Sequence, residues 1–241
     1  MAMVNRKTSA RPNPTLFSQI SSSITTPNAI KYVARREIGL LNSKENPDKN
    51  STVLCPSIGS KPFLDGKFDE PLWQQLKEQS IQLAGDARLG DTEIQLVRDE
   101  QYLYIRIRAT KKVKSIPRVE NAKRHRDPSF QNSEHITLRL DLDRDFETWF
   151  ELSVDRRGHV AESINGNRKW DPTWYVARAE TDSQWSIEAA IPLKELVGES
   201  TNQIQLHGNH WGFSASRSFK NHSVHWPHRS DSRPLGTLSF Q

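Results

Sequence analysis

The stretch that most constrains the fold of this chain is residues 134–158, EHITLRLDLDRDFETWFELSVDRRG. The apolar positions of its first arm alternate with polar ones and are Ile136, Leu138, Leu140 and Leu142. After the charged turn DRDFE the alternation resumes, with the apolar positions Phe150, Leu152 and Val154. A period of two in both arms is typical of half-buried antiparallel strands. The stretch therefore predicts a central hairpin of a β-sandwich, whose polar face could serve as the floor of a ligand site.

Other apolar or alternating runs predict the remaining strands. They span residues 80–85, 92–99, 102–109, 174–180, 185–192, 211–219, 223–227 and 236–240. One short helix is expected after Pro71, because proline is favoured in the first helical turn. Residues 159–173 read as a connection rich in Gly and Asn. The predicted fold class is all-β: an antiparallel β-sandwich of about ten strands, immunoglobulin-like or jelly-roll-like.

The first part of the chain has a different composition. Residues 1–51 are rich in Ser, Thr, Asn, Pro and Lys, which is typical of a linker. Within them, residues 28–41 could form one short helix with Asn28 as its N-cap. A lone helix of this length is marginal in water. The predicted organisation is a low-order segment over 1–51, with a helix at 28–41, followed by the sandwich over 52–241.

Charge and cysteine usage exclude several classes of protein. The net charge of +5 comes from 34 basic and 29 acidic residues without a dominant block, so nucleic acid is not an expected partner. Cys55 is the one cysteine, which excludes an internal disulfide and a multi-cysteine metal site. No run approaches the roughly 18 apolar residues of a membrane span. No signal peptide is visible, and the sequence does not identify the compartment.

Six blocks of sequence carry a family resemblance. They occur in order over residues 60–241 and read LDGKFDEPLW, VRDEQYLYIRIRA, LRLDLD with FELSVDRRG, WSIEAAIPLKEL, WGFSASRS and PLGTLSF. Together they resemble a carbohydrate-binding module of family 9, which has a DOMON-like β-sandwich. The resemblance implies a non-catalytic domain that binds an oligo- or polysaccharide, linked to polysaccharide catabolism and often part of a larger, secreted chain.

The resemblance also indicates where a sugar would bind. Family members hold a terminal sugar between two tryptophans, because the apolar C–H faces of a pyranose stack on aromatic rings. The second of these positions matches Trp226, and the first falls near Phe130, where this chain has no tryptophan. Thr137 stands where the family has a carboxylate. Further aromatic candidates, on the polar face of the hairpin or in the following connection, are Trp149, Trp170 and Trp174.

Two arginines complete the candidate ligand-binding residues. Arg217 shares a strand face with the apolar Trp211, and a charge on a core face requires either a carboxylate partner or a ligand. Arg139 lies on the polar face of the hairpin, either as part of a cross-strand charge ladder or as a ligand contact. The sequence leaves both alternatives open for each arginine.

The sequence predicts no cofactor and no catalysis. Asp141, Asp143 and Asp145 resemble half of a structural calcium site, although interleaved arginines would offset the charge that the ion needs. Haem binding, a further possibility for a DOMON-like domain, is disfavoured because the two methionines lie at positions 1 and 3. No motif of a hydrolase, metalloprotease or nucleotide-binding enzyme is present. The alternative to sugar binding is a structural or protein-interaction sandwich that has lost the sugar site.

Overall fold

A computed structural model describes residues 14–41, 51–112, 127–130, 132–197, 210–227 and 235–241 of the protein. The chain divides into two compact units, residues 1–49 and 50–241. In the first unit, helix α1 (Pro14–Ser22) lies against helix α2 (Asn28–Leu41). The bounds of α2 are those that the sequence predicts, whereas α1 was not predicted because its serines read as linker. Among the described residues, no helix combines the length and the apolar character that crossing a bilayer requires.

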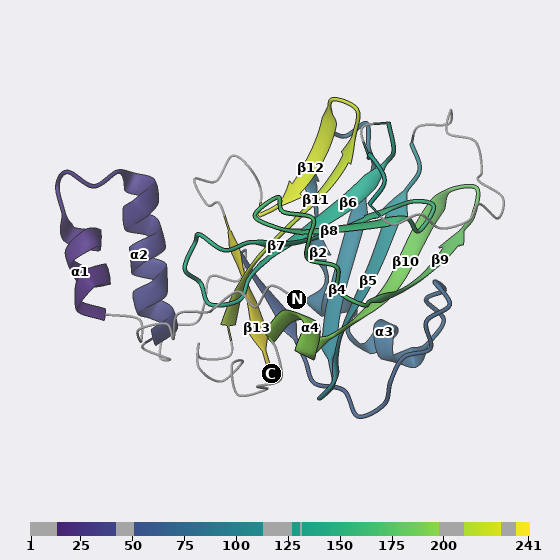
Figure 1. The fold of residues 1–241 in the computed structure, drawn as a ribbon, viewed down its shortest axis with the longest axis horizontal. Coiled ribbons are helices and arrows are strands. Elements are labelled where there is room, and N and C mark those ends of the chain that lie inside the picture. The colour runs from purple at the N-terminus through teal and green to yellow at the C-terminus, as the bar shows by residue number, and fades with distance from the viewer. Residues whose placement is uncertain (1–13, 42–50, 113–126, 131, 198–209, 228–234) are drawn as a thin grey trace. The chain divides into compact units, whose positions relative to one another are not determined.

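The second unit consists mainly of two β-sheets (Figure 1). The first sheet has the order β1-β13-β11-β6-β7-β8, with β12 paired to β11 and β3 paired to β12; the second has the order β2-β4-β5-β10-β9. The strands are β1 (Thr52–Cys55), β2 (Ile81–Gln82), β3 (Ala84–Gly85), β4 (Thr92–Arg98), β5 (Tyr102–Thr110), β6 (His135–Asp141), β7 (Phe150–Asp155), β8 (Val160–Ile164), β9 (Tyr175–Glu180), β10 (Gln184–Pro192), β11 (His210–Phe219), β12 (His222–Trp226) and β13 (Gly236–Phe240). The prediction of an all-β sandwich is confirmed.

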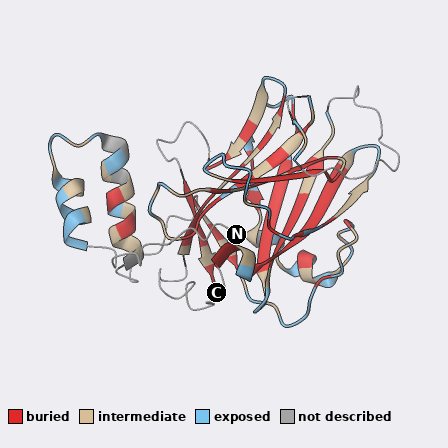
Figure 2. Ribbon diagram, viewed as in Figure 1, coloured by how far each residue is buried: buried red, intermediate tan, exposed pale blue. Residues whose placement is uncertain are grey.

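The hairpin that dominates the sequence pattern forms as predicted. Strands β6 and β7 pair antiparallel, with Leu138 opposite Leu152 and Arg139 opposite Glu151. The apolar positions of both strands are buried and belong to one core with the inner residues of the second sheet, including Trp185. Figure 2 shows these buried residues along the strands of both sheets. Burial of this shared face is the main stabilisation of the sandwich.

Two strands were not predicted, and each lacks a clear alternating pattern. Strand β8 lies in the stretch that the sequence assigns to a connection, and it pairs antiparallel with β7. Glu162 interrupts its pattern, yet this residue is buried because the indole N–H of Trp174 donates a hydrogen bond to its carboxylate. Strand β1 pairs in parallel with β13 at the other edge of the sheet. Short strands of mixed composition are held by pairing and burial rather than by local preference.

The outer face of the second sheet is buried, although the sequence predicts a polar face there. In YLYIRIRA (102–109) the alternation puts Tyr104 and Arg106 of β5 on the face opposite the apolar Ile105, which predicts that they are exposed, yet both are buried. Trp73, on helix α3 (Pro71–Gln75), packs on the sheet with Val97 and Tyr104. The Arg106 guanidinium lies 3.9 Å from the ring centre of Phe68, and burial lowers its pKa to about 10. The segment before β2, with its 3₁₀ turn Lys77–Gln79, therefore forms a third layer on this sheet. After β10, helix α4 (Leu193–Val197) instead buries Leu193, Leu196 and Val197 in the core that the two sheets share.

Glu188 of β10 lies beneath this third layer and has no solvent exposure. One carboxylate oxygen accepts hydrogen bonds from the backbone N–H groups of Asp65 and Gly66, at 3.0 and 2.8 Å. The other oxygen has no partner among the described residues. Burial raises the pKa of Glu188 to about 7, against an ordinary value of 4.5. The carboxyl group therefore stays protonated in the folded protein at pH values where the unfolded chain is ionised.

This shift predicts how stability depends on pH. Because the folded state keeps its proton to a higher pH than the unfolded chain, stability should fall as the pH rises from about 4.5 to 7. Glu188→Gln removes the titrating carboxyl group and hence this pH dependence of stability. The amide oxygen of glutamine can still accept the hydrogen bonds from Asp65 and Gly66. We expect wild type and variant to be similar at pH 4, and the variant to be more stable by about 2–4 kcal/mol at pH 8. Urea unfolding at both pH values measures this, and stability curves that run parallel would contradict it.

Candidate functional site

A hollow of about 510 Å³ lies at the end of the first sheet where β6 begins and β11 ends. The described residues that line it are Ser129, Phe130, His135, Arg168 and Lys220. They come from three separate parts of the chain: the segment before β6 together with the first residue of that strand, the β8–β9 connection and the β11–β12 turn. The volume is within the range of about 300–1,000 Å³ that is typical of small-molecule sites. The hollow is therefore large enough for a sugar unit.

Phe130 gives the hollow an aromatic wall. Its ring stacks on the imidazole of His135, with centroids 5.0 Å apart and an interplanar angle of 15°. The backbone N–H of Ser133 donates to the carbonyl of Phe130 at 3.0 Å, and the Ser133 carbonyl lies 2.9 Å from His135 Nδ1. The ring is half-buried, so it is fixed on one side and accessible on the other. Among the described residues, Phe130 is the one predicted aromatic that lines the hollow.

Short hydroxyl side chains continue from the hollow across the outer face of the first sheet. Ser218 of β11 lies opposite His135, and Ser216 lies opposite Thr137. Thr137 in turn faces Ser153 of β7, with 2.8 Å between their hydroxyl oxygens. These residues share the outer face because they alternate with buried ones. This surface offers both donors and acceptors for sugar hydroxyls.

Two of the predicted stacking tryptophans are buried. Trp226 and Trp174 are each only 8% exposed. The Trp226 ring packs at 5.6 Å from that of Phe213, and its place on β12 turns it toward the core. Trp174 hydrogen-bonds to the buried Glu162, as described above. The structure therefore corrects the prediction of a stacking surface at these two residues, because their rings already pack within the protein.

Trp149 and Trp170 are half-buried and do not line the hollow. The Trp170 ring meets Phe150 edge-on, with centroids 5.1 Å apart, and covers the rim of the core. The backbone of Trp149 forms two hydrogen bonds with Asn165. The Trp149 N–H donates to the side-chain oxygen of Asn165 at 2.7 Å, and the Asn165 backbone N–H donates to the Trp149 carbonyl at 2.9 Å. Both rings keep some exposed surface, so a stacking role for them stays a prediction.

Arg217 has a structural environment. Its side chain is 1% exposed and forms an ion pair with Glu134, in which Nε lies 2.7 Å from Oε1. The remaining N–H groups donate to the hydroxyl of Thr92 at 2.9 Å and to the carbonyl of Thr110 at 2.7 Å. Burial lowers the pKa of Arg217, and the charge of Glu134 opposes that shift. Of the two alternatives, the structure supports the carboxylate partner and corrects the prediction of a ligand contact.

Arg139 has a different environment from Arg217. It lies exposed on the outer face of the first sheet and forms an ion pair with Glu151 of the neighbouring strand. A second oxygen of Glu151 accepts a hydrogen bond from Ser163 at 3.1 Å. This is the cross-strand charge ladder that the sequence offered as one reading. A contact of Arg139 with ligand stays a prediction.

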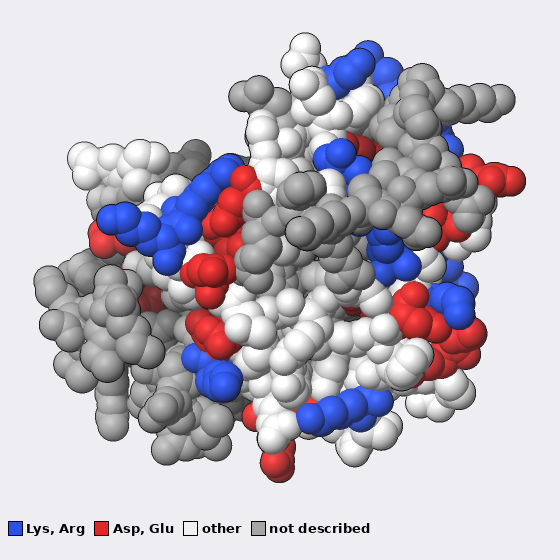
Figure 3. Space-filling view, turned by 45° about the vertical axis from the view of Figure 1, so that its right-hand side comes forward, with Lys and Arg blue, Asp and Glu red and all other residues white. Residues whose placement is uncertain are grey.

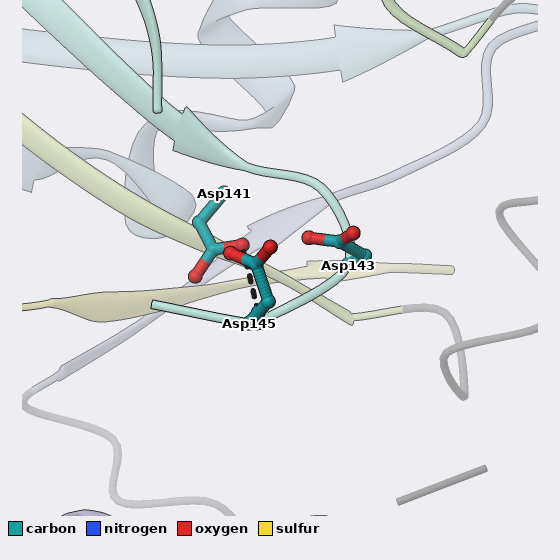
Figure 4. A group of neighbouring side chains, drawn as sticks. All are labelled: Asp141, Asp143 and Asp145. Atoms are coloured by element: carbon teal, nitrogen blue, oxygen red, sulfur yellow. Dashed lines mark hydrogen bonds between the residues drawn. The ribbon is translucent and has the colours of Figure 1, made fainter. Parts of the chain in front are cut away.

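The three aspartates of the β6–β7 turn do approach one another (Figure 4). One oxygen atom of each of Asp141, Asp143 and Asp145 lies within 4.8 Å of the others. Asp141 is fully buried and accepts hydrogen bonds from the backbone N–H groups of Asp145 and Phe146, at 3.2 and 3.1 Å. Burial raises its pKa to about 7. Although its alternation with Leu140 and Leu142 predicts an exposed position, Asp141 stabilises the turn from inside. Calcium at the cluster stays a prediction.

Charges of both signs are close to balanced in this chain. Figure 3 shows basic and acidic groups interspersed on the face that it presents. This agrees with the balance of 34 basic and 29 acidic residues. Electrostatic preference for a ligand must therefore come from local groups rather than from a field of one sign.

Four residues of the hollow were not identified from the sequence. Ser129, His135, Arg168 and Lys220 lie in unremarkable polar stretches, and the pairing of β11 with β6 brings Lys220, which follows β11, near His135. His135 gave a weak signal, because the alternation of β6 places it on the same polar face as Thr137 and Arg139. Arg168 and Lys220 gave none, since their neighbourhood depends on contacts between distant segments.

Comparison with known proteins supports the fold. No protein-family model and no curated protein sequence matches this chain. Its structure is similar to a family 9 carbohydrate-binding module from Caldicellulosiruptor kristjanssonii in complex with cellotriose, with a TM-score of 0.54 and 11% identity over 79% of this chain and 93% of that one. The same kind of module from that organism in complex with glucose gives 0.52 and 12%, over 79% and 95%. A structure from Bacteroides uniformis gives 0.51 and 11%, over 79% and 99%. The chain therefore has a fold like that of family 9 carbohydrate-binding modules.

Proposed function

We propose that this chain is a non-catalytic domain that binds carbohydrate in the hollow beside Phe130. The observation that carries the proposal is a half-buried aromatic ring, fixed by His135, at the wall of a cavity of about 510 Å³. Two similar structures hold cellotriose and glucose. Although identity to them is low, the shared fold makes a sugar the first ligand to test.

The chemistry of the lining fits a sugar. A pyranose combines C–H groups on its faces with hydroxyls at its rim, so a site needs one aromatic surface and several polar groups. Phe130 supplies the aromatic surface, and Ser129, His135 and Lys220 supply hydrogen-bonding groups. Hydrolysis of a glycosidic bond normally requires two carboxyl groups beside it. None of the described lining residues carries one, which supports binding without catalysis.

The proposed ligand is an oligo- or polysaccharide. The hydroxyl-bearing outer face next to the hollow, with Ser216, Ser218 and Thr137, extends the polar surface beyond a single sugar unit. We further propose that the domain serves polysaccharide breakdown as part of a larger chain. A calcium ion at the aspartates of the β6–β7 turn would act on stability rather than at the hollow, since Asp141 lies at the opposite end of β6 from His135.

Removing the ring of Phe130 should abolish most of the binding. Truncation of a central aromatic contact costs more than about 1.4 kcal/mol, which corresponds to at least tenfold weaker affinity. Affinity electrophoresis in gels that contain individual polysaccharides measures this retention. Phe63→Ala is the matched control, because Phe63 is 74% exposed and does not line the hollow. We expect wild type and Phe63→Ala to be retarded in the same gels, and Phe130→Ala to migrate freely.

Two outcomes would contradict the proposal. If Phe130→Ala is retarded as strongly as wild type, sugar binds elsewhere on the domain. If wild type is retarded by no polysaccharide, the alternative of a structural or protein-interaction sandwich gains support. Circular dichroism of each variant confirms that the fold is intact before the gels are compared.

A further inference from the structure

We propose that the hollow selects a sugar that carries an anionic substituent, either a carboxylate or a sulfate ester. This inference rests on the proposed function and deepens it. The hollow is lined by Arg168 and Lys220, and none of the described lining residues is acidic. A neutral sugar needs no cation, whereas an anionic group is bound most strongly by charge-assisted hydrogen bonds. The lining is therefore complementary in charge to an acidic sugar.

The two carboxylates next to His135, one preceding it in sequence and one opposite it in the sheet, already have partners. Glu134, which precedes His135, is paired with the buried Arg217. Asp155, opposite His135 on β7, is buried and paired with Arg157 at 2.8 Å. These groups therefore do not neutralise the cations that line the hollow.

The two cations of the hollow have no ion pair in the described part of the chain. Lys220 Nζ lies 5.3 Å from the ring centre of Phe219, the one contact assigned to its ammonium group. Arg168 is exposed and has no assigned carboxylate partner among the described residues. An incoming anion would therefore gain these interactions without first breaking an existing ion pair, which lowers the cost of binding.

The backbone at Lys220 gives a second argument. Lys220 and Asn221 form the two-residue turn between β11 and β12, and Lys220 has φ of +52°. This conformation is unfavourable for a lysine and is adopted readily by glycine. In two-residue hairpin turns where only the first central residue has positive φ, as here, glycine is the residue usually found there. A strained residue at a candidate ligand site supports a functional role for its side chain.

The two cations would act in different ways. The planar guanidinium of Arg168 can donate two parallel hydrogen bonds to the two oxygens of a carboxylate or sulfate. The ammonium group of Lys220 is a compact charge that adapts to the position of the anion. With the sugar ring against Phe130, the anionic substituent would reach these groups at the rim of the hollow.

Matched pairs of polysaccharides test this inference. Binding constants are measured by isothermal titration for polygalacturonate against its methyl ester, and for dextran sulfate against dextran. We expect wild type to bind at least one acidic member at least about tenfold more tightly than its neutral counterpart. The two pairs distinguish a carboxylate from a sulfate ester as the preferred group.

Variants separate the hollow from non-specific charge. Lys220→Gln and Arg168→Gln should each lower the preference for the acidic polymer several-fold. Lys194→Gln is the matched control, because Lys194 is an exposed lysine at the other end of the sandwich. It lies on α4, directly after the end of β10 that pairs with Tyr102, the first residue of β5. The hollow lies near the opposite end of β5, where Arg217 contacts Thr110. Lys220→Gly should lose the same preference while raising the melting temperature, because glycine relieves the positive φ.

The outcomes distinguish this inference from the function on which it rests. Equal affinity for acidic and neutral polymers overturns the anionic preference and leaves sugar binding intact. If Lys194→Gln lowers the preference for the acidic polymer as much as Lys220→Gln does, the polymer is attracted by net charge alone. This result also overturns the proposed anionic preference of the hollow. Binding to none of the four polymers, together with free migration in every polysaccharide gel, overturns both proposals.

Discussion

Replacing Arg217 with methionine is expected to destabilise the sandwich by about 3–5 kcal/mol, the usual cost of removing one partner from a buried ion pair. The variant leaves the Glu134 carboxylate buried without its cation. It also removes hydrogen bonds to Thr92 and Thr110, which tie β11 of the first sheet to β4 and β5 of the second. Urea unfolding followed by tryptophan fluorescence measures the change in the free energy of unfolding.

Two further variants show whether this cost comes from the unpaired carboxylate. The double variant Arg217→Met/Glu134→Gln should lose less than the sum of the two single variants, because neither charge is then left alone. Arg139→Met is the matched control, since its ion pair with Glu151 is exposed and should contribute about 1 kcal/mol or less. Equal losses from Arg217→Met and Arg139→Met would contradict the structural role assigned to Arg217.

The second large effect is expected at Gly66, where Gly66→Ala should cost about 2–5 kcal/mol from backbone strain and overpacking together. Gly66 has φ of +79°, and an added Cβ would lie 2.4 Å from the carbonyl carbon of Arg178 and 2.5 Å from the backbone nitrogen of Ala179. Both contacts are with backbone of β9, which cannot rotate away. Relief would shift the segment that covers the second sheet and weaken its hydrogen bond to Glu188.

Two other glycines separate the contributions at Gly66. Gly166 has φ of +77° but no heavy atom within 4 Å of an added Cβ, so Gly166→Ala should show the backbone strain alone. Gly59 has neither feature, and Gly59→Ala should be close to neutral. The expected order of destabilisation in urea unfolding is Gly66→Ala, then Gly166→Ala, then Gly59→Ala. A Gly66→Ala variant as stable as Gly59→Ala would show that the covering segment does not pack as described.

The fold could be predicted from the sequence where one face of a strand is apolar and the other polar. The β6–β7 hairpin is such a case, and its apolar positions are buried as the pattern indicates. The pattern fails where both faces are buried, as on β5, because Tyr104 and Arg106 read as solvent-facing until α3 and its neighbours cover them. It also fails on β8, where the buried Glu162 depends on Trp174, a partner that no local pattern reveals.

The candidate site was harder to predict than the fold. Phe130 was identified through the resemblance to family 9 modules, whereas Trp226 was expected to be exposed and is buried against Phe213. Aromatic residues suit both a core and a sugar site, and residue type alone does not separate the two roles. The cations of the hollow, Arg168 and Lys220, come from turns more than fifty residues apart in sequence, and no local pattern indicates that they line the same hollow.

The most direct test of the central claim, that sugar binds beside Phe130, is to map the bound surface by NMR. Backbone amide shifts of the isotope-labelled chain are followed while oligosaccharides, neutral and acidic, are added in turn. The account predicts saturable shifts that are largest at Ser129, Phe130, His135 and Lys220 and that vanish in Phe130→Ala. The account would be contradicted by shifts concentrated elsewhere on the domain. It would also be contradicted if fragments of a polysaccharide that retards wild type in affinity gels caused no shifts.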